Sequence, residues 1–173
     1  MTTEAHTPER NWAGNYTYRA AKLHRPHSLE ELQEVVSKAS SVHALGSRHS
    51  FNDIADAAEL ISLETLRAEE SLPEANIVDR QANTVSFGGS VKYGELVDTL
   101  NDEGLALHNM ASLPHITVAG SISTATHGSG VRHGNLATAV AGLEFVTSTG
   151  EVVRVSRGDL DFEAWWSGWG HWA

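Results

Sequence analysis

A histidine placed directly after a tight glycine turn is the first residue of this sequence that could do chemistry. His49 lies in the stretch A-L-G-S-R-H-S-F-N, residues 44–52, just after Gly46. An imidazole can serve as a nucleophile, a proton carrier or a metal ligand, and a turn would present it outward. The alternative is that His49 is an ordinary surface or capping residue, and this stretch alone does not decide between the two.

A second glycine-bearing segment, residues 118–130, consists almost wholly of small and hydroxyl-bearing residues. It reads V-A-G-S-I-S-T-A-T-H-G-S-G. Small residues let a ligand approach the main chain, hydroxyls add uncharged donors, and successive backbone N–H groups can surround a phosphate. Neither segment has the G-x-G-x-x-G or G-x-x-x-x-G-K spacing, so the common nucleotide-binding folds are not supported. A flexible loop is the alternative interpretation.

Composition excludes several classes of site and partner. The chain has 173 residues, the length of one domain, and contains no cysteine. Disulfides, thiolate metal sites, iron–sulfur clusters and cysteine nucleophiles are therefore excluded. A formal net charge of -10 with only 12 Lys and Arg argues against nucleic-acid binding. His24 and His27 flank Pro26 without a third ligand at suitable spacing, so we expect no metal site.

No apolar run approaches the roughly 20 residues of a membrane helix, and the first residues do not resemble a secretory signal. We therefore expect a cytoplasmic protein without a membrane partner. The sequence leaves the oligomeric state open.

The elements that must position the two glycine segments alternate along the chain. Ser28 stands three residues before Glu31, which is capping-box spacing, and a helical period follows to residue 39. A second amphipathic run, residues 93–100, ends at Gly104. We expect strands at 42–45, 61–63 and 105–107, and hairpins of 77–79 with 84–87 and of 140–146 with 152–155. Because hairpins recur among the helices, the fold class is predicted to be α+β rather than a doubly wound parallel sheet.

Together the two segments resemble the flavin-binding half of the vanillyl-alcohol-oxidase superfamily. The likeness is carried by residues 44–52, by N-M-A-S-L-P-H-I-T-V-A-G-S-I-S-T-A-T-H-G-S-G at 109–130, and by N-W-A-G-N at 11–15. Within the superfamily, the sequence is similar to bacterial alditol (xylitol) oxidases, which are relatives of the sugar-lactone oxidases. The resemblance implies a PCMH-type FAD-binding domain over residues 11–162. FAD would lie between a small first lobe, ending near residue 63, and a second lobe of mostly antiparallel strands.

The resemblance also implies roles for individual residues. His49 would be the covalent anchor, with a ring nitrogen bonded to the 8α-methyl group of the flavin ring. Ser112 would lie beside that ring and touch a polyol substrate, and the small Ala111 would leave oxygen a path. The other residues implied to bind FAD are Ala44, Leu45, Gly46, Ser47, Arg48, Ser50, Thr117, Gly120, Thr124, Ala125, Thr126 and His127.

The implied activity is oxidation of a terminal alcohol of a sugar alcohol, with oxygen as acceptor and hydrogen peroxide as product. A sugar-1,4-lactone oxidase is one alternative. A flavin-binding module without catalysis and a fragment that neither folds nor loads flavin are two others. The catalytic charged groups of the family lie in a substrate domain that we do not find in this sequence. We therefore expect no catalytic residue here and no turnover by this chain alone.

Arg48 departs from the G-S-G-H-S pattern of many relatives, which have glycine at this position. A left-handed backbone would cost an arginine about 1 kcal/mol or more. Alternatively, Arg48 keeps an ordinary conformation and directs its guanidinium at the diphosphate or at a neighbouring helix. The sequence does not choose between these conformations.

The last residues, 163–173, do not fit the pattern of the rest. They read E-A-W-W-S-G-W-G-H-W-A and hold four of the five tryptophans. Each buried indole N–H needs a partner, which a short polar segment can hardly supply. A shifted reading frame permits G-V-V-V-G-L-G-A-L-G, similar to the apolar segment with which these oxidases continue. We therefore expect an out-of-frame tail, and the alternative is a genuine short protein with an aromatic C-terminal patch.

Overall fold

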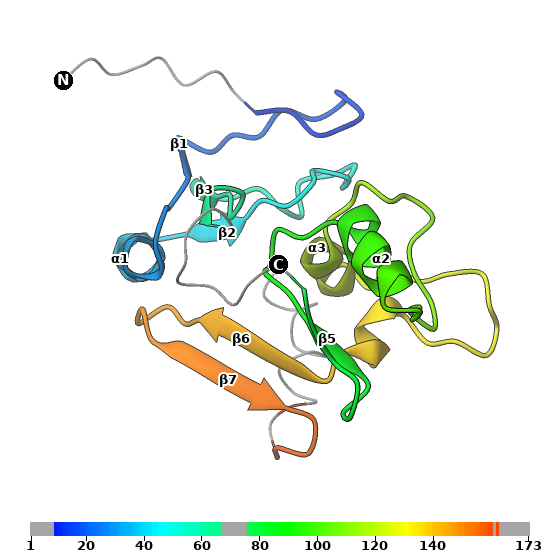
Figure 1. Ribbon diagram of the computed structural model, residues 1–173. Helices are drawn as coiled ribbons and strands as arrows, with labels where there is room; N and C mark the ends of the chain where they lie inside the picture. Colours follow the sequence, from blue (N-terminus) through cyan, green and yellow to red (C-terminus); the bar gives the residue numbers. More distant parts are fainter. Residues whose placement is uncertain (1–8, 67–75, 161, 163–173) are drawn as a thin grey trace.

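A small parallel sheet forms the first part of the computed structural model, which describes residues 9–66, 76–160 and 162. Its strands are β1 (Lys22–His24), β2 (Val42–Ala44) and β3 (Glu59–Ile61), in the order β1-β3-β2 with both pairs parallel (Figure 1). The third strand begins and ends two residues before the predicted run at 61–63. The predicted out-of-frame tail, residues 163–173, lies outside the described residues.

Helix α1 (Leu29–Lys38) connects β1 to β2 and begins where the capping signal predicts. The Ser28 side chain accepts the N–H of Glu31 at 3.2 Å. The Glu31 carboxylate accepts the N–H of His27 at 2.8 Å, one residue before the cap. The capping box predicted at the start of α1 is therefore present in altered form. Ser28 caps the helix as predicted, but the Glu31 carboxylate accepts the N–H of His27 instead of that of Ser28.

Helix α2 (Tyr93–Asp102) is also confirmed, with Gly104 just beyond its end at a φ of 67°. The strand predicted at 105–107 is wrong, because this segment closes the helix instead of pairing with another strand. The Leu105 N–H donates to the Leu100 carbonyl at 2.7 Å, and Leu105 and Leu107 pack against the core around α2.

Both predicted hairpins are present and antiparallel, which confirms the α+β class. The first joins β4 (Ile77–Asp79) to β5 (Thr84–Ser86). The second joins β6 (Gly142–Val146) to β7 (Val152–Ser156) through a turn with Gly150 at a φ of 82°. Between the hairpins come α2, the short α3 (Val118–Ser123) and the 3₁₀ helix η2 (Leu136–Ala139) (Figure 1).

Two hydrophobic clusters correspond to the two predicted lobes. The smaller contains Tyr18, Ala20, Leu45 and Leu60, and so holds the parallel sheet to the N-terminal segment. The larger surrounds α2 and α3, where the buried hydroxyls of Tyr93 and Ser121 are 2.9 Å apart. No helix in residues 9–66 or 76–160 is long and apolar enough to cross a membrane.

Candidate functional site

The two glycine segments singled out in the sequence meet in the folded chain. The Thr117 N–H, just before α3, donates to the Ser47 hydroxyl at 3.1 Å. Next to this contact, the Nε2 atoms of His49 and His115 are 2.8 Å apart. The turn that follows β2 and the segment that enters α3 therefore form one site, although β3 and α2 separate them in sequence.

Gly46 makes this close approach possible, and Gly120, in the same segment as Thr117, leaves room for the threonine side chain. A Cβ atom on Gly46 would lie 2.6 Å from the Thr117 hydroxyl oxygen, and one on Gly120 would lie 2.7 Å from the same atom. Contacts under 3.0 Å are not tolerated, so no side chain fits at either position without a shift. The Thr117 hydroxyl is buried and has no hydrogen-bond partner among the described residues. This hydroxyl fills the space between Gly46 of the turn and Gly120 of α3.

The His49 ring is held at both nitrogens. Nδ1 is 3.0 Å from the Ser47 carbonyl oxygen, which can only accept, so Nδ1 carries a proton. Burial, with a smaller contribution from His115, lowers the pKa of His49 below its usual value despite the Ser47 bond. In the neutral ring Nε2 therefore carries the lone pair, which accepts the Nε2–H of His115 at 2.8 Å. The arrangement keeps a neutral, nucleophilic imidazole in a fixed orientation.

Trp12 covers one face of that imidazole. The two rings stack with centroids 4.9 Å apart and planes 23° from parallel, although the tryptophan is 61% exposed. His115 lies 4.6 Å from His49, centroid to centroid. Trp12 and His115 both lie in stretches that carry the family resemblance, but no spacing rule places them against His49, so the sequence analysis did not assign them to the site.

The conformation of Arg48 settles the question that the sequence left open. Its φ is 63°, in the left-handed region that glycine adopts freely. Its guanidinium does not point to a helix: Nη1 pairs with the Glu9 carboxylate at 3.1 Å. The turn beside His49 therefore contains a strained residue, held by an ion pair to the N-terminal segment.

The main chain of this turn offers unused donors. None of the backbone N–H groups of residues 46–50 donates a hydrogen bond within the described part of the chain. These residues are exposed or half-buried, so a ligand can reach them. Consecutive N–H groups around a left-handed residue bind anions without a lysine or arginine. Their chemistry fits the diphosphate of a dinucleotide such as FAD.

The remaining residues predicted to bind FAD or substrate differ in their exposure to solvent. Leu45 lies in the small core and its N–H donates to the Ile61 carbonyl, so its side chain is not free to touch a ligand. Ser112 is exposed and Ala111 is buried, in the loop between α2 and α3. In the segment after α3, the hydroxyls of Thr124 and Thr126 are 3.3 Å apart. Of the other predicted residues, Ala44 at the end of β2 is exposed. Ala125 and His127, which follow α3, are also exposed, and Ala125 has a φ of 53°.

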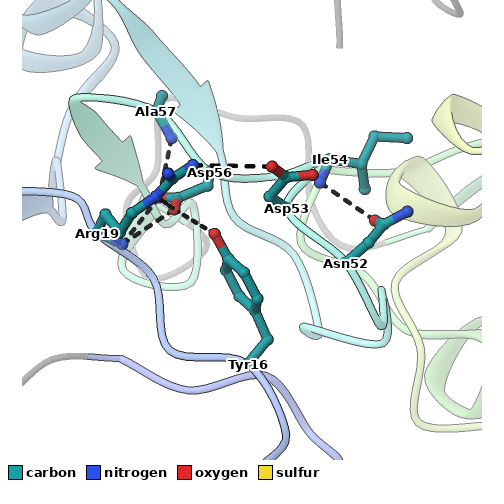
Figure 2. Close-up of polar contacts among 7 residues, drawn as sticks. All are labelled: Tyr16, Arg19, Asn52, Asp53, Ile54, Asp56 and Ala57. Atoms are coloured by element: carbon teal, nitrogen blue, oxygen red, sulfur yellow. Dashed lines mark hydrogen bonds and ion pairs between the residues drawn. The ribbon is translucent and has the colours of Figure 1, made fainter.

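A buried carboxylate, that of Asp56, anchors the N-terminal segment (Figure 2). Asp56, with a side chain only 2% exposed, accepts hydrogen bonds from the Tyr16 hydroxyl at 2.7 Å and from Arg19 Nε at 3.1 Å. The backbone N–H of Arg19 also donates to both carboxylate oxygens of Asp56. Burial alone would raise the pKa of Asp56, but these hydrogen bonds hold it below its usual value.

A metal centre is not formed within the part of the chain that the structure describes. Within residues 9–66 and 76–160, no three His, Asp or Glu side chains come together as a metal-binding group. His24, one of the two histidines considered in the sequence analysis, pairs with Glu59 at 2.5 Å.

Comparison with known proteins shows the family of the chain. Residues 20–156 match the family described as FAD binding domain. The chain is 48% identical over 156 residues to an alditol oxidase from a Streptomyces species, covering 88% of this chain and 36% of that protein. It is 33% identical to an L-gulono-1,4-lactone dehydrogenase of Mycobacterium tuberculosis, with coverages of 86% and 35%. A D-arabinono-1,4-lactone oxidase of Yarrowia lipolytica is 31% identical, with coverages of 85% and 28%. The chain thus spans about a third of the length of these relatives.

Proposed function

Because this chain belongs to the FAD binding domain family, we propose that it is the flavin-binding part of an alditol oxidase and that His49 is the covalent anchor of FAD. The single observation that carries this proposal is the meeting of the two glycine segments at His49. There a neutral imidazole, free N–H groups and close-packed glycines lie within one site.

In this proposal the turn at 46–50 binds the diphosphate through its N–H groups, and the loop after α3 lines the rest of the cofactor. Ser112 faces the polyol and Ala111 admits oxygen. When bound, FAD supplies the capacity to accept a hydride. The overall reaction balances: the alcohol loses two hydrogens and becomes an aldehyde, and oxygen takes up both as hydrogen peroxide. The fixed His49 ring limits the motion of the attached cofactor.

The first test is whether flavin stays with the protein after denaturation. Chain incubated with FAD in air should give a yellow, fluorescent pellet after acid precipitation, whereas His49→Ala should give a colourless one. His43→Ala, which removes a histidine from neighbouring β2, should stay yellow. A yellow His49→Ala pellet would show that another residue is the anchor, and a colourless wild-type pellet would reject covalent attachment.

The substrate class needs a separate measurement. The relative with 48% identity carries the name alditol oxidase, whereas two with lower identity carry lactone names. This favours an alditol, and a sugar-1,4-lactone is the second candidate. Peroxide formation by a protein that carries this sequence within a chain of the relatives' length should be faster with xylitol than with L-gulono-1,4-lactone. Once flavin attachment is complete, the 173-residue chain alone should give no xylitol-dependent peroxide above free flavin, and a rate above that would contradict our expectation of no turnover by this chain alone.

A further inference from the structure

The N-terminal strap, residues 9–19, lies along the His49 turn, residues 46–52, and is joined to it at several points. The contacts between the strap and the turn are Trp12 N–H to the Arg48 carbonyl at 2.8 Å, Asn11 Nδ2 to the Ser50 carbonyl at 3.0 Å, Asn15 Nδ2 to the Phe51 carbonyl at 3.4 Å, and Glu9 to Arg48 at 3.1 Å. The strap therefore binds both the main chain and a side chain of the turn.

The strap is itself held by hydrogen bonds at both ends of this contact. Asn11 is 4% exposed, and its amide also bonds to Asn15 at 2.7 Å and accepts the Tyr16 N–H at 3.0 Å. Farther along, Tyr16 and Arg19 bind the buried Asp56 carboxylate (Figure 2). A segment fixed in this way can hold a strained turn without unfolding locally.

Arg48 is the residue of the turn that needs such support. An arginine at a φ of 63° is less stable there than in an ordinary conformation, so the isolated turn would relax. The strap opposes this relaxation through two contacts with Arg48. The Trp12 N–H donates to the Arg48 carbonyl, and the Glu9 carboxylate pairs with the Arg48 guanidinium. The indole of Trp12 then stacks on His49, the next residue of the turn.

We propose that the N-terminal strap positions His49 for flavin attachment, with Glu9 acting through the strained Arg48 and Trp12 acting through the imidazole ring. The inference rests on the proposed covalent role of His49. Attachment joins a His49 nitrogen to the 8α-carbon with loss of one hydrogen from each, and oxygen takes up the two hydrogens as peroxide. The strap reduces the rotation that the ring would otherwise have to lose, which speeds this step without touching the flavin.

The test is a set of single and double variants of the whole chain. Glu9→Gln should lower the hydrogen-exchange protection of the Trp12 amide and slow covalent flavin incorporation, each by about threefold. Arg25→Gln is the matched control, because Arg25 binds the same Glu9 carboxylate at 3.3 Å but does not touch the turn. Trp12→Leu should slow incorporation by roughly three- to tenfold and remove the upfield ring-current shift of the His49 ring protons.

A rescue variant separates positioning from a loss of fold. Arg48→Gly adopts the left-handed conformation freely, so adding Glu9→Gln to it should not slow incorporation further. The proposal is overturned if Glu9→Gln slows flavin incorporation as much in the Arg48→Gly background as it does in the wild-type chain. It is also overturned if Glu9→Gln slows incorporation no more than Arg25→Gln does. Equal incorporation in all variants would also overturn it while leaving the covalent role of His49 intact. If wild-type chain incorporates no flavin, the proposed function fails; the Trp12 amide and His49 ring signals then still show whether the strap holds the turn.

Discussion

At the residue scale, the character of His49 is set by its neighbours and not by the glycine turn alone. Ser47 fixes the proton on Nδ1, His115 lies on Nε2, and burial disfavours the charged ring. A histidine that is protonated cannot act as a nucleophile, so the lowered pKa keeps the ring competent to more acidic pH than an exposed histidine.

Removing His115 should therefore raise the pKa of His49. A hydrogen bond to the lone pair of the neutral ring and a nearby second imidazole both disfavour protonation, and His115→Ala removes both. An NMR titration of the His49 Cε1–H should show its midpoint moving upward towards the ordinary value of about 6.5. His108→Ala, which removes a histidine that contacts His133 instead, should leave the midpoint unchanged. A downward shift would contradict the assigned tautomer.

Asp56 gives the free energy of unfolding a pH dependence of the same sign as His49, because the pKa of each group is lowered in the folded chain. Its folded-state pKa is lowered, so its stabilising effect is complete above the ordinary carboxyl value and is lost as the pH falls through the folded value. Asp56→Asn should lower the free energy of unfolding by about 1–3 kcal/mol at neutral pH, because it weakens the bonds from Tyr16 and Arg19. Denaturant titrations should show this difference shrinking in acid. A difference independent of pH would indicate that shape, not charge, is responsible.

At the scale of elements, the site depends on how closely the turn after β2 approaches the entrance to α3. The approach depends on Gly46, because a Cβ atom there would lie 2.6 Å from the Thr117 hydroxyl oxygen. The contact is steric and has little tolerance, since a closely packed interior does not absorb an added methyl group.

Gly46→Ala should destabilise the chain by about 1–3 kcal/mol through overlap with Thr117. Removing the hydroxyl should relieve the overlap, so Gly46→Ala with Thr117→Ala should be less destabilised than the sum of the single variants. Gly88→Ala is the control, because a Cβ atom there meets nothing within 4 Å. Thermal or urea unfolding measures all four variants, and strict additivity would reject the steric explanation.

At the scale of the whole molecule, a contact between α1 and the second hairpin joins the first part of the chain to the last. The Gln33 side chain donates to the Gly150 carbonyl at 2.6 Å. A Cβ atom on Gly150 would lie 3.1 Å from the Gln33 carbonyl oxygen, so the turn and the helix are also closely packed.

Gln33→Ala should lower the free energy of unfolding by about 0.5–1.5 kcal/mol, the usual contribution of one hydrogen bond. Gln81→Ala, an exposed glutamine in the turn of the first hairpin, is the matched control and should have little effect. Urea unfolding followed by circular dichroism compares the two. Equal stability of both variants would show that the α1 contact does not contribute.

The sequence by itself determined the local elements and the residue types of the site. Capping at Ser28, the end of α2 at Gly104 and both hairpins follow from interactions between residues close in the chain, and each was predicted. The strand expected at 105–107 was not found, because a short apolar run has no partner until the tertiary structure supplies one. The family resemblance supplied His49 and the cofactor, which periodicity could not.

Only the tertiary structure decided which distant residues meet. The stacking of Trp12 on His49, the contact of His115 and the pairing of Arg48 with Glu9 join segments far apart in the chain. No local pattern encodes such pairings, since they depend on the register of β1, β3 and β2 and on the packing of the N-terminal strap over them. The left-handed conformation of Arg48 is likewise stable only because non-local contacts hold it.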